Sequence, residues 1–101
     1  MKAAATAIAV ALSLPAIAMA VTDCSRAKTN FEKLLCSNAR LEQADQRLAI
    51  AFREALNRGI SPELLIDSQR AWMRDSRDIC NDVQCMLDAY GARISDLDNQ
   101  H

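Results

Sequence analysis

Apolar side chains recur at intervals of mostly three and four residues in three stretches of the chain, a spacing typical of amphipathic helices. The first stretch carries Leu41, Ala44, Leu48, Phe52 and Ala55. In the second stretch Leu65, Trp72 and Ile79 share one helix face with Ser68, and the third carries Val83, Leu87, Tyr90, Ile94 and Leu97. Because each apolar row needs a neighbour to cover it, the pattern predicts helices that pack against one another.

Capping residues and glycine indicate where these helices begin and end. Thr29-Asn30-Phe31-Glu32 fits a capping box and predicts a short first helix that runs to Cys36. Asn38 can cap the next helix, and Gly59 can end it. Ser61-Pro62 places a capping residue before a proline at the first helical position, which predicts the start of another helix. Asn81-Asp82 then interrupts the pattern before the last helix.

The composition agrees with a helical protein, since the chain has only 2 glycines and 2 prolines. We therefore predict an all-α fold, a small disulfide-stapled antiparallel helical bundle of three to four helices with Trp72 and Phe52 near its centre. A chain of 101 residues fits a single domain. A domain this small buries only ~60% of its unfolded surface, so covalent crosslinks matter to its stability.

The first residues have the pattern of a cleavable export signal. Met1–Lys2 is a short basic start, Ala3–Ala18 is an apolar run, and Ala18-Met19-Ala20 fits a signal-peptidase site. We predict a signal peptide over residues 1–20 and a helical domain over residues 21–101. The apolar run is shorter than the ~20 residues of a membrane span, so we expect no stable membrane anchor. The expected location is periplasmic or secreted.

All four cysteines, Cys24, Cys36, Cys80 and Cys85, follow the predicted cleavage site. An even number of cysteines in a small exported domain indicates disulfides. Zinc sites usually have paired C-x2-C motifs, which these spacings lack, so we expect no metal. The four cysteines allow three pairings. Crossed pairs would remove more loop-closure entropy. Local rings close readily in an unfolded chain, however, and we favour Cys24–Cys36 with Cys80–Cys85.

Charge and candidate chemistry argue against an enzyme or a nucleic-acid-binding protein. The formal net charge is −1, without the basic surplus of a protein that binds nucleic acid. The only histidine is His101, so a Ser-His or Cys-His nucleophile pair cannot be built. The carboxylates are expected to pair with arginines on exposed helix faces, as in Asp67–Arg70 and Arg74–Asp78. We expect no catalytic residues and no cofactor.

One carboxylate stands out from this pattern. On a helix, Asp45 falls about 40° from Leu41 and about 20° from Phe52, inside the apolar stripe. A carboxylate in that position requires a buried partner, and Arg70 or Arg77 is the candidate. We interpret the pair as a structural contact that fixes helix register. Trp72 is interpreted as a core residue.

Several short motifs resemble one family along nearly the whole predicted mature chain. The opening Cys…Thr-x-x-Glu-x-x-[Ile/Leu]-Cys motif is matched at Cys24, Thr29, Glu32 and Leu35-Cys36, and a Leu…Asp step at Leu41 and Asp45. The core Gln-Arg-x-Trp…Arg-Asp-x-Cys motif and the closing Cys-Leu…Tyr…Arg-Ile…Leu motif are matched at Gln69-Arg70, Trp72, Arg77-Asp78, Cys80, Cys85-Met86, Tyr90, Arg93-Ile94 and Leu97. The chain thereby resembles the LprI-type lysozyme inhibitors. We interpret Asp45, Gln69, Arg70, Trp72, Arg77 and Tyr90 as structural residues.

The resemblance implies an exported protein that binds and occludes lysozyme without catalysis, so the expected partner is a protein, with lysozyme as the candidate. It assigns no residue of this chain to partner binding. The alternative is a periplasmic structural or stress-related interaction module with another partner.

Overall fold

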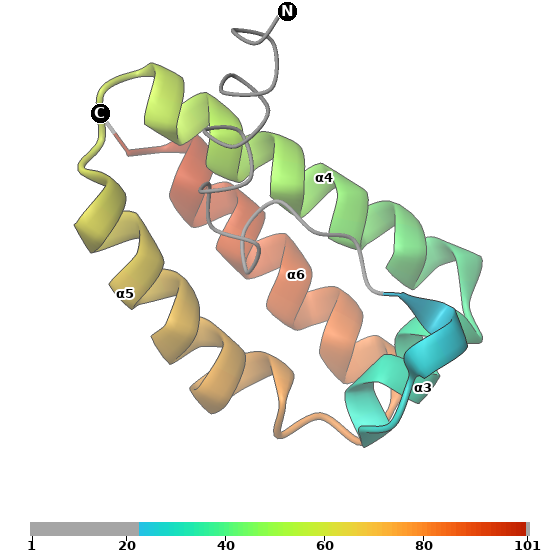
Figure 1. The fold of residues 1–101 in the computed structure, drawn as a ribbon. Helices are drawn as coiled ribbons and strands as arrows, with labels where there is room; N and C mark the ends of the chain where they lie inside the picture. The colour runs from blue at the N-terminus through green and yellow to red at the C-terminus, as the bar shows by residue number, and fades with distance from the viewer. Residues whose placement is uncertain (1–22, 101) are drawn as a thin grey trace, which may run out of the picture.

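Every regular element in the described part of the chain is helical (Figure 1). The computed structural model describes residues 23–100, so the predicted signal peptide and His101 lie outside the described residues. A short 3-10 turn η1 (Cys24–Arg26) precedes the helices α3 (Asn30–Cys36), α4 (Ala39–Asn57) and α5 (Pro62–Trp72). A π-helical segment η2 (Met73–Arg77) extends α5, and α6 (Val83–Asp98) ends the fold.

The predicted helix starts are confirmed by their capping contacts. The Thr29 hydroxyl accepts the backbone N–H of Glu32, and Glu32 reaches back to the Thr29 N–H, which completes the capping box of α3. The side chain of Asn38 caps α4. The side chain of Ser61 caps α5, and Pro62 follows as the first residue of that helix. These helices start where short-range hydrogen bonding satisfies the first free N–H groups.

Glycine ends α4 as predicted. Gly59 has φ 94°, a conformation that costs glycine little and other residues much. The N–H of Gly59 donates to the Leu56 carbonyl at 3.0 Å, and that of Ile60 donates to the Ala55 carbonyl at 3.2 Å. These two bonds make a Schellman motif, which turns the chain sharply into α5.

The three long helices form an up-down-up bundle. α4 and α6 lie side by side and run in the same direction, while α5 runs antiparallel to both (Figure 1). Trp72 at the end of α5 contacts Ala89 in the first half of α6, and Gln69 contacts Arg93 further along α6, which fixes that antiparallel direction. Short turns connect the successive helices, which is why each is antiparallel to the one before it. α3 packs beside the first half of α4 and covers that end of the bundle (Figure 1).

The core contains side chains from all four helices and one cysteine of the loop before α6. Its buried members are Leu35, Leu41, Ala44, Leu48, Ala51, Phe52, Ala55, Leu65, Trp72, Cys80, Met86, Tyr90 and Leu97. Phe52 is 1% exposed and Trp72 is 9% exposed, so both predicted central residues are in the core.

The prediction that Ile79 shares the buried face of Leu65 and Trp72 is wrong. Ile79 is 67% exposed, whereas the next residue, Cys80, is 1% exposed. The cause is η2, in which the Asp78 N–H donates to the Met73 carbonyl five residues earlier, at 2.8 Å. This wider turn adds one residue to the helical period. Burial therefore moves from residue 79 to residue 80.

The predicted apolar row of α6 is displaced as well. The buried residues of that helix are Met86, Tyr90, Arg93 and Leu97, and the predicted members Val83, Leu87 and Ile94 are only partly buried. α6 packs against both α4 and α5, so its buried face is wider than one row. The centre of that face includes an arginine, which an apolar pattern alone does not predict.

The free end of α6 is capped by an arginine from another helix. Arg58, the C-cap residue of α4, donates through Nη2 to the Leu97 carbonyl and through Nε to the Gln100 carbonyl. A cation at a helix C-terminus satisfies free carbonyl groups and interacts favourably with the helix dipole. The contact holds the ends of α4 and α6 together.

Candidate functional site

A buried tyrosine joins α6 to α4 and α5. The Tyr90 side chain is fully buried, and its hydroxyl donates to Asp45 Oδ1 at 2.9 Å. Its ring meets the Trp72 ring edge-on, with centroids 5.2 Å apart and an interplanar angle of 71°. The Trp72 Nε1–H donates to the Ala89 carbonyl at 3.1 Å. Both aromatic residues therefore have polar partners as well as apolar contacts, as buried tyrosine and tryptophan usually do.

The predicted partner of Asp45 is corrected by this contact. We expected Arg70 or Arg77, but the residue that bonds Asp45 is Tyr90, while Arg70 is exposed. Burial, followed by the negative charge of Asp45 and its hydrogen bond, raises the pKa of Tyr90 well above its ordinary value. Tyr90 is therefore a neutral hydrogen-bond donor at physiological pH and is not poised for proton transfer.

Arg77 connects the π-helical segment to α3. Its guanidinium carbon lies 3.6 Å from the centre of the Phe31 ring and 5.9 Å from that of the Trp72 ring. Its Nε donates to Asp78 Oδ1 at 2.8 Å, and only 15% of the side chain is exposed. A guanidinium stacked on an aromatic face and paired with a carboxylate is a stable packing element.

A second polar cluster lies where α6 meets α5. Arg93 is 5% exposed, and its Nε donates to Gln69 Oε1 at 2.8 Å. Its Nη2 donates to Ser68 Oγ at 2.9 Å. Burial lowers the pKa of Arg93, although nearby Asp96 opposes that effect. The guanidinium remains charged, because arginine does not release its proton in proteins.

Sequence reasoning placed Arg93 within a family motif but gave it no role. The signal that could have identified it is its spacing, three residues after Tyr90 and four before Leu97, inside the row that α6 buries. The structure places five of the six predicted structural residues in the two polar clusters or against them. These are Asp45, Gln69, Trp72, Arg77 and Tyr90. We call the two clusters together the polar seam.

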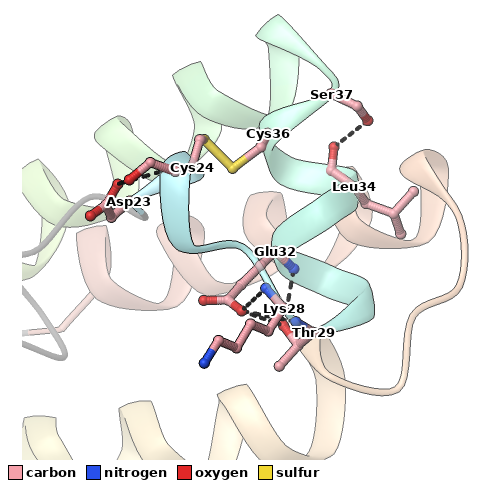
Figure 2. Close-up of a disulfide and its surroundings, with 9 residues drawn as sticks. Asp23, Cys24, Lys28, Thr29, Glu32, Leu34, Cys36 and Ser37 are labelled. Atoms are coloured by element: carbon pink, nitrogen blue, oxygen red, sulfur yellow. Dashed lines mark hydrogen bonds between the residues drawn. A yellow bond between two sulfur atoms is a disulfide. The ribbon is translucent and has the colours of Figure 1, made fainter.

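The two disulfides join neighbouring elements. Cys24 of η1 bonds Cys36 in the last turn of α3, and Figure 2 shows how this bond closes the loop that contains the capping box. In that loop Glu32 Oε1 accepts the backbone N–H groups of Thr29 and Lys28, and these bonds lower the pKa of Glu32.

Cys80 bonds Cys85 and joins the loop before α6 to the first turn of that helix. The structure therefore contains the local pairing that the sequence favoured. The Asn30 amide also donates to the Asn81 Oδ1 at 3.2 Å, which links the start of α3 to the loop before α6.

Among residues 23–100, three large apolar side chains are exposed: Ile50, Leu64 and Ile79. Ile50 borders a shallow hollow of about 200 Å³ between α4 and α6, whose rim contains both signs of charge: Arg47, Glu54 and Asp98. Leu64 borders another of about 400 Å³, with Ile60, Ser68 and Gln100. Ile79 stands on the loop that the second disulfide closes.

Among residues 23–100, no three His, Cys, Asp or Glu side chains are arranged to hold a metal ion. None of the described helices combines the length and the hydrophobicity that a membrane span requires. The side chains of the seam bond one another inside the bundle, and the buried Asp45 Oδ2 is left without a hydrogen bond. The candidate functional region is therefore the outer surface of the bundle.

A family model described as lysozyme inhibitor LprI matches residues 22–97. No curated protein and no solved structure matches the chain.

Proposed function

The chain belongs to the LprI family of lysozyme inhibitors, and from that premise we propose that it is an exported protein that binds lysozyme and occludes its cleft without catalysis of its own. The observation that carries this proposal is the family match, which spans the bundle from before the first disulfide to the last turn of α6. Lysozyme is the partner that the family description names.

Export is supported by the amino terminus and by the cysteines. The basic start, apolar run and cleavage motif of residues 1–20 have the order of a signal peptide. Behind them, both disulfides need an oxidising compartment to form and persist. The periplasm or the cell exterior supplies that compartment, and it is also where a lysozyme would be met.

Binding without catalysis is supported by how the polar side chains are used. Asp45, Gln69 and Arg93 are the groups whose burial would suit an active site, and all three bond other residues of the bundle. A scaffold held by two disulfides and a polar seam loses little further entropy on association, because its surface is already ordered.

The proposal is tested with the purified, oxidised protein and lysozyme. We expect a saturable decrease in the rate at which lysozyme clears a suspension of cell walls, together with a binding isotherm by calorimetry. Unchanged lysis at a large molar excess, with no heat of binding, would reject lysozyme as the partner. That result would favour an interaction module with another partner. Cell-wall turnover by the protein alone would instead identify an enzyme.

A further inference from the structure

We propose that the loop between η2 and α6, residues 78–82, is the surface that contacts lysozyme, with Ile79 as its apolar anchor. This inference rests on the proposed function and specifies where the contact is made. Ile79 is 67% exposed. In this position its β-branched side chain can become buried only by contact with another molecule. Interfaces are commonly centred on one or a few such anchors surrounded by polar groups.

The exposure of Ile79 is built into the fold. The π-helical hydrogen bond from the Asp78 N–H to the Met73 carbonyl moves residue 79 outward and turns Cys80 into the core. Without that extra residue in the turn, the helical period would bury Ile79 beside Trp72. The chain thus departs from regular helix at the point where it presents an aliphatic side chain to solvent.

The loop that carries Ile79 is held at both ends. The Cys80–Cys85 disulfide closes it onto α6, and the Cys80 N–H donates to the Arg77 carbonyl at 3.1 Å. Asn81 accepts from Asn30 of α3 at 3.2 Å. A side chain on a pre-ordered loop gives up less conformational entropy on binding than one on a mobile loop.

The charge around Ile79 suits a basic partner such as lysozyme. Residues 74–82 contain three aspartates and two arginines, a net charge of −1. Asp75 pairs with exposed Arg74, and Asp78 pairs with Arg77, whose side chain is turned inward over Phe31 and is 15% exposed. Asp82, the exposed N-cap residue of α6, is the acidic group near the anchor that has no cationic partner among the described residues. Complementary charge accelerates association and favours the correct partner.

The other two exposed apolar residues stand on regular helices, whereas Ile79 stands on a loop that a disulfide closes. Ile50 stands on a regular helix above a rim of mixed charge. Leu64 is exposed to the same 67% as Ile79, but it stands in the first turn of α5, near the opposite end of the bundle (Figure 1). Leu64 therefore offers a matched control.

The experiment compares Ile79→Gln with Leu64→Gln in the full oxidised protein. We expect Ile79→Gln to weaken lysozyme affinity at least about tenfold, and Leu64→Gln to change it less than about twofold. Far-ultraviolet circular dichroism and the melting temperature should stay the same for both, because both side chains are exposed. If glutamine disturbs the loop, Ile79→Thr keeps the branched shape near the backbone and should still weaken binding.

Each outcome of the experiment has its own meaning. Equal affinity of the wild type and a correctly folded Ile79→Gln protein would overturn the loop as the contact and leave the proposed function standing. Loss of binding in Leu64→Gln alone would likewise overturn it and place the contact at the other end of the bundle. No binding by the wild type would overturn the proposed function itself, and this inference with it.

Discussion

Removing the acceptor that the buried Arg93 guanidinium uses should destabilise the bundle at least as much as removing both partners. Gln69→Met replaces the amide with an apolar side chain of similar size, and leaves the Arg93 Nε–H without its 2.8 Å acceptor. A hydrogen bond to a charged group contributes about 1.5–3 kcal/mol, and a buried donor left unpaired adds a desolvation cost. The second bond of Arg93, to Ser68 Oγ, remains. We therefore expect a loss of about 2–3 kcal/mol in the free energy of unfolding for Gln69→Met.

Two further variants, Arg93→Met and the double variant of Gln69 and Arg93, complete a double-mutant cycle. Arg93→Met removes the charge and leaves only the neutral Gln69 oxygen unpaired, which costs about 1–2 kcal/mol before any gain from apolar packing. With both replaced, no polar group of the pair is buried without a partner. We expect the double variant to be more stable than the sum of the single losses by about 2 kcal/mol.

The assay is urea unfolding of the oxidised protein, followed by circular dichroism and by the fluorescence of Trp72, the only tryptophan. Coincidence of the two transitions would establish two-state unfolding, which the calculation of free energies requires. A 2 kcal/mol loss corresponds to roughly 8–16 °C in melting temperature for a domain of this size. Additivity of the two single changes to within about 0.5 kcal/mol would refute the coupling of Gln69 and Arg93.

Three further changes test other contacts. Because the pKa of Tyr90 is raised in the fold, the unfolded chain loses a proton above pH about 10 that the folded chain keeps. Stability should therefore fall as pH rises beyond that point, and in Tyr90→Phe this part of the fall should be absent. Replacing both Cys24 and Cys36 with alanine opens a ring closed across 12 residues, and should lower the free energy of unfolding by about 3 kcal/mol in urea titrations. Arg58→Ala removes the cap of α6 and should lose about 1 kcal/mol, against less than about 0.5 for the exposed control Arg53→Ala on the same helix.

The helices could be predicted from the sequence because short-range chemistry encodes their ends. The hydroxyl of Thr29, the amide of Asn38 and the hydroxyl of Ser61 each bond backbone groups two or three residues away. Gly59 reverses the chain through its own positive φ. Such contacts need no knowledge of the tertiary fold, so the boundaries of α3, α4 and α5 follow from local pattern.

The π-helical segment and the seam depend on tertiary contacts, so the spacing of residues along the chain does not predict them. A regular period places Ile79 inside, and only the packing of Arg77 on Phe31 and the burial of Cys80 reveal the extra residue in the turn. The partner of Asp45 was sought among cations, since a carboxylate on an apolar face favours an ion pair. A buried tyrosine hydroxyl can fill that role, and no spacing along the chain links residue 45 to residue 90.

We expect the polar seam to determine the stability of the bundle and the exposed loop to determine its affinity for lysozyme. Two sets of variants can separate these effects. The motif residues that identify the family, such as Gln69, Trp72 and Tyr90, lie inside the bundle, so family membership chiefly reflects the scaffold. Ile79 occupies the unspecified position of the Arg-Asp-x-Cys motif, between Asp78 and the buried Cys80. Its side chain can therefore change without disturbing the seam. Seam variants should lose stability and, while still folded, retain lysozyme affinity, whereas changes at residue 79 should lose affinity and keep stability. A stable, weakly binding seam variant would contradict this separation, because it would mean that the buried network itself shapes the contact surface.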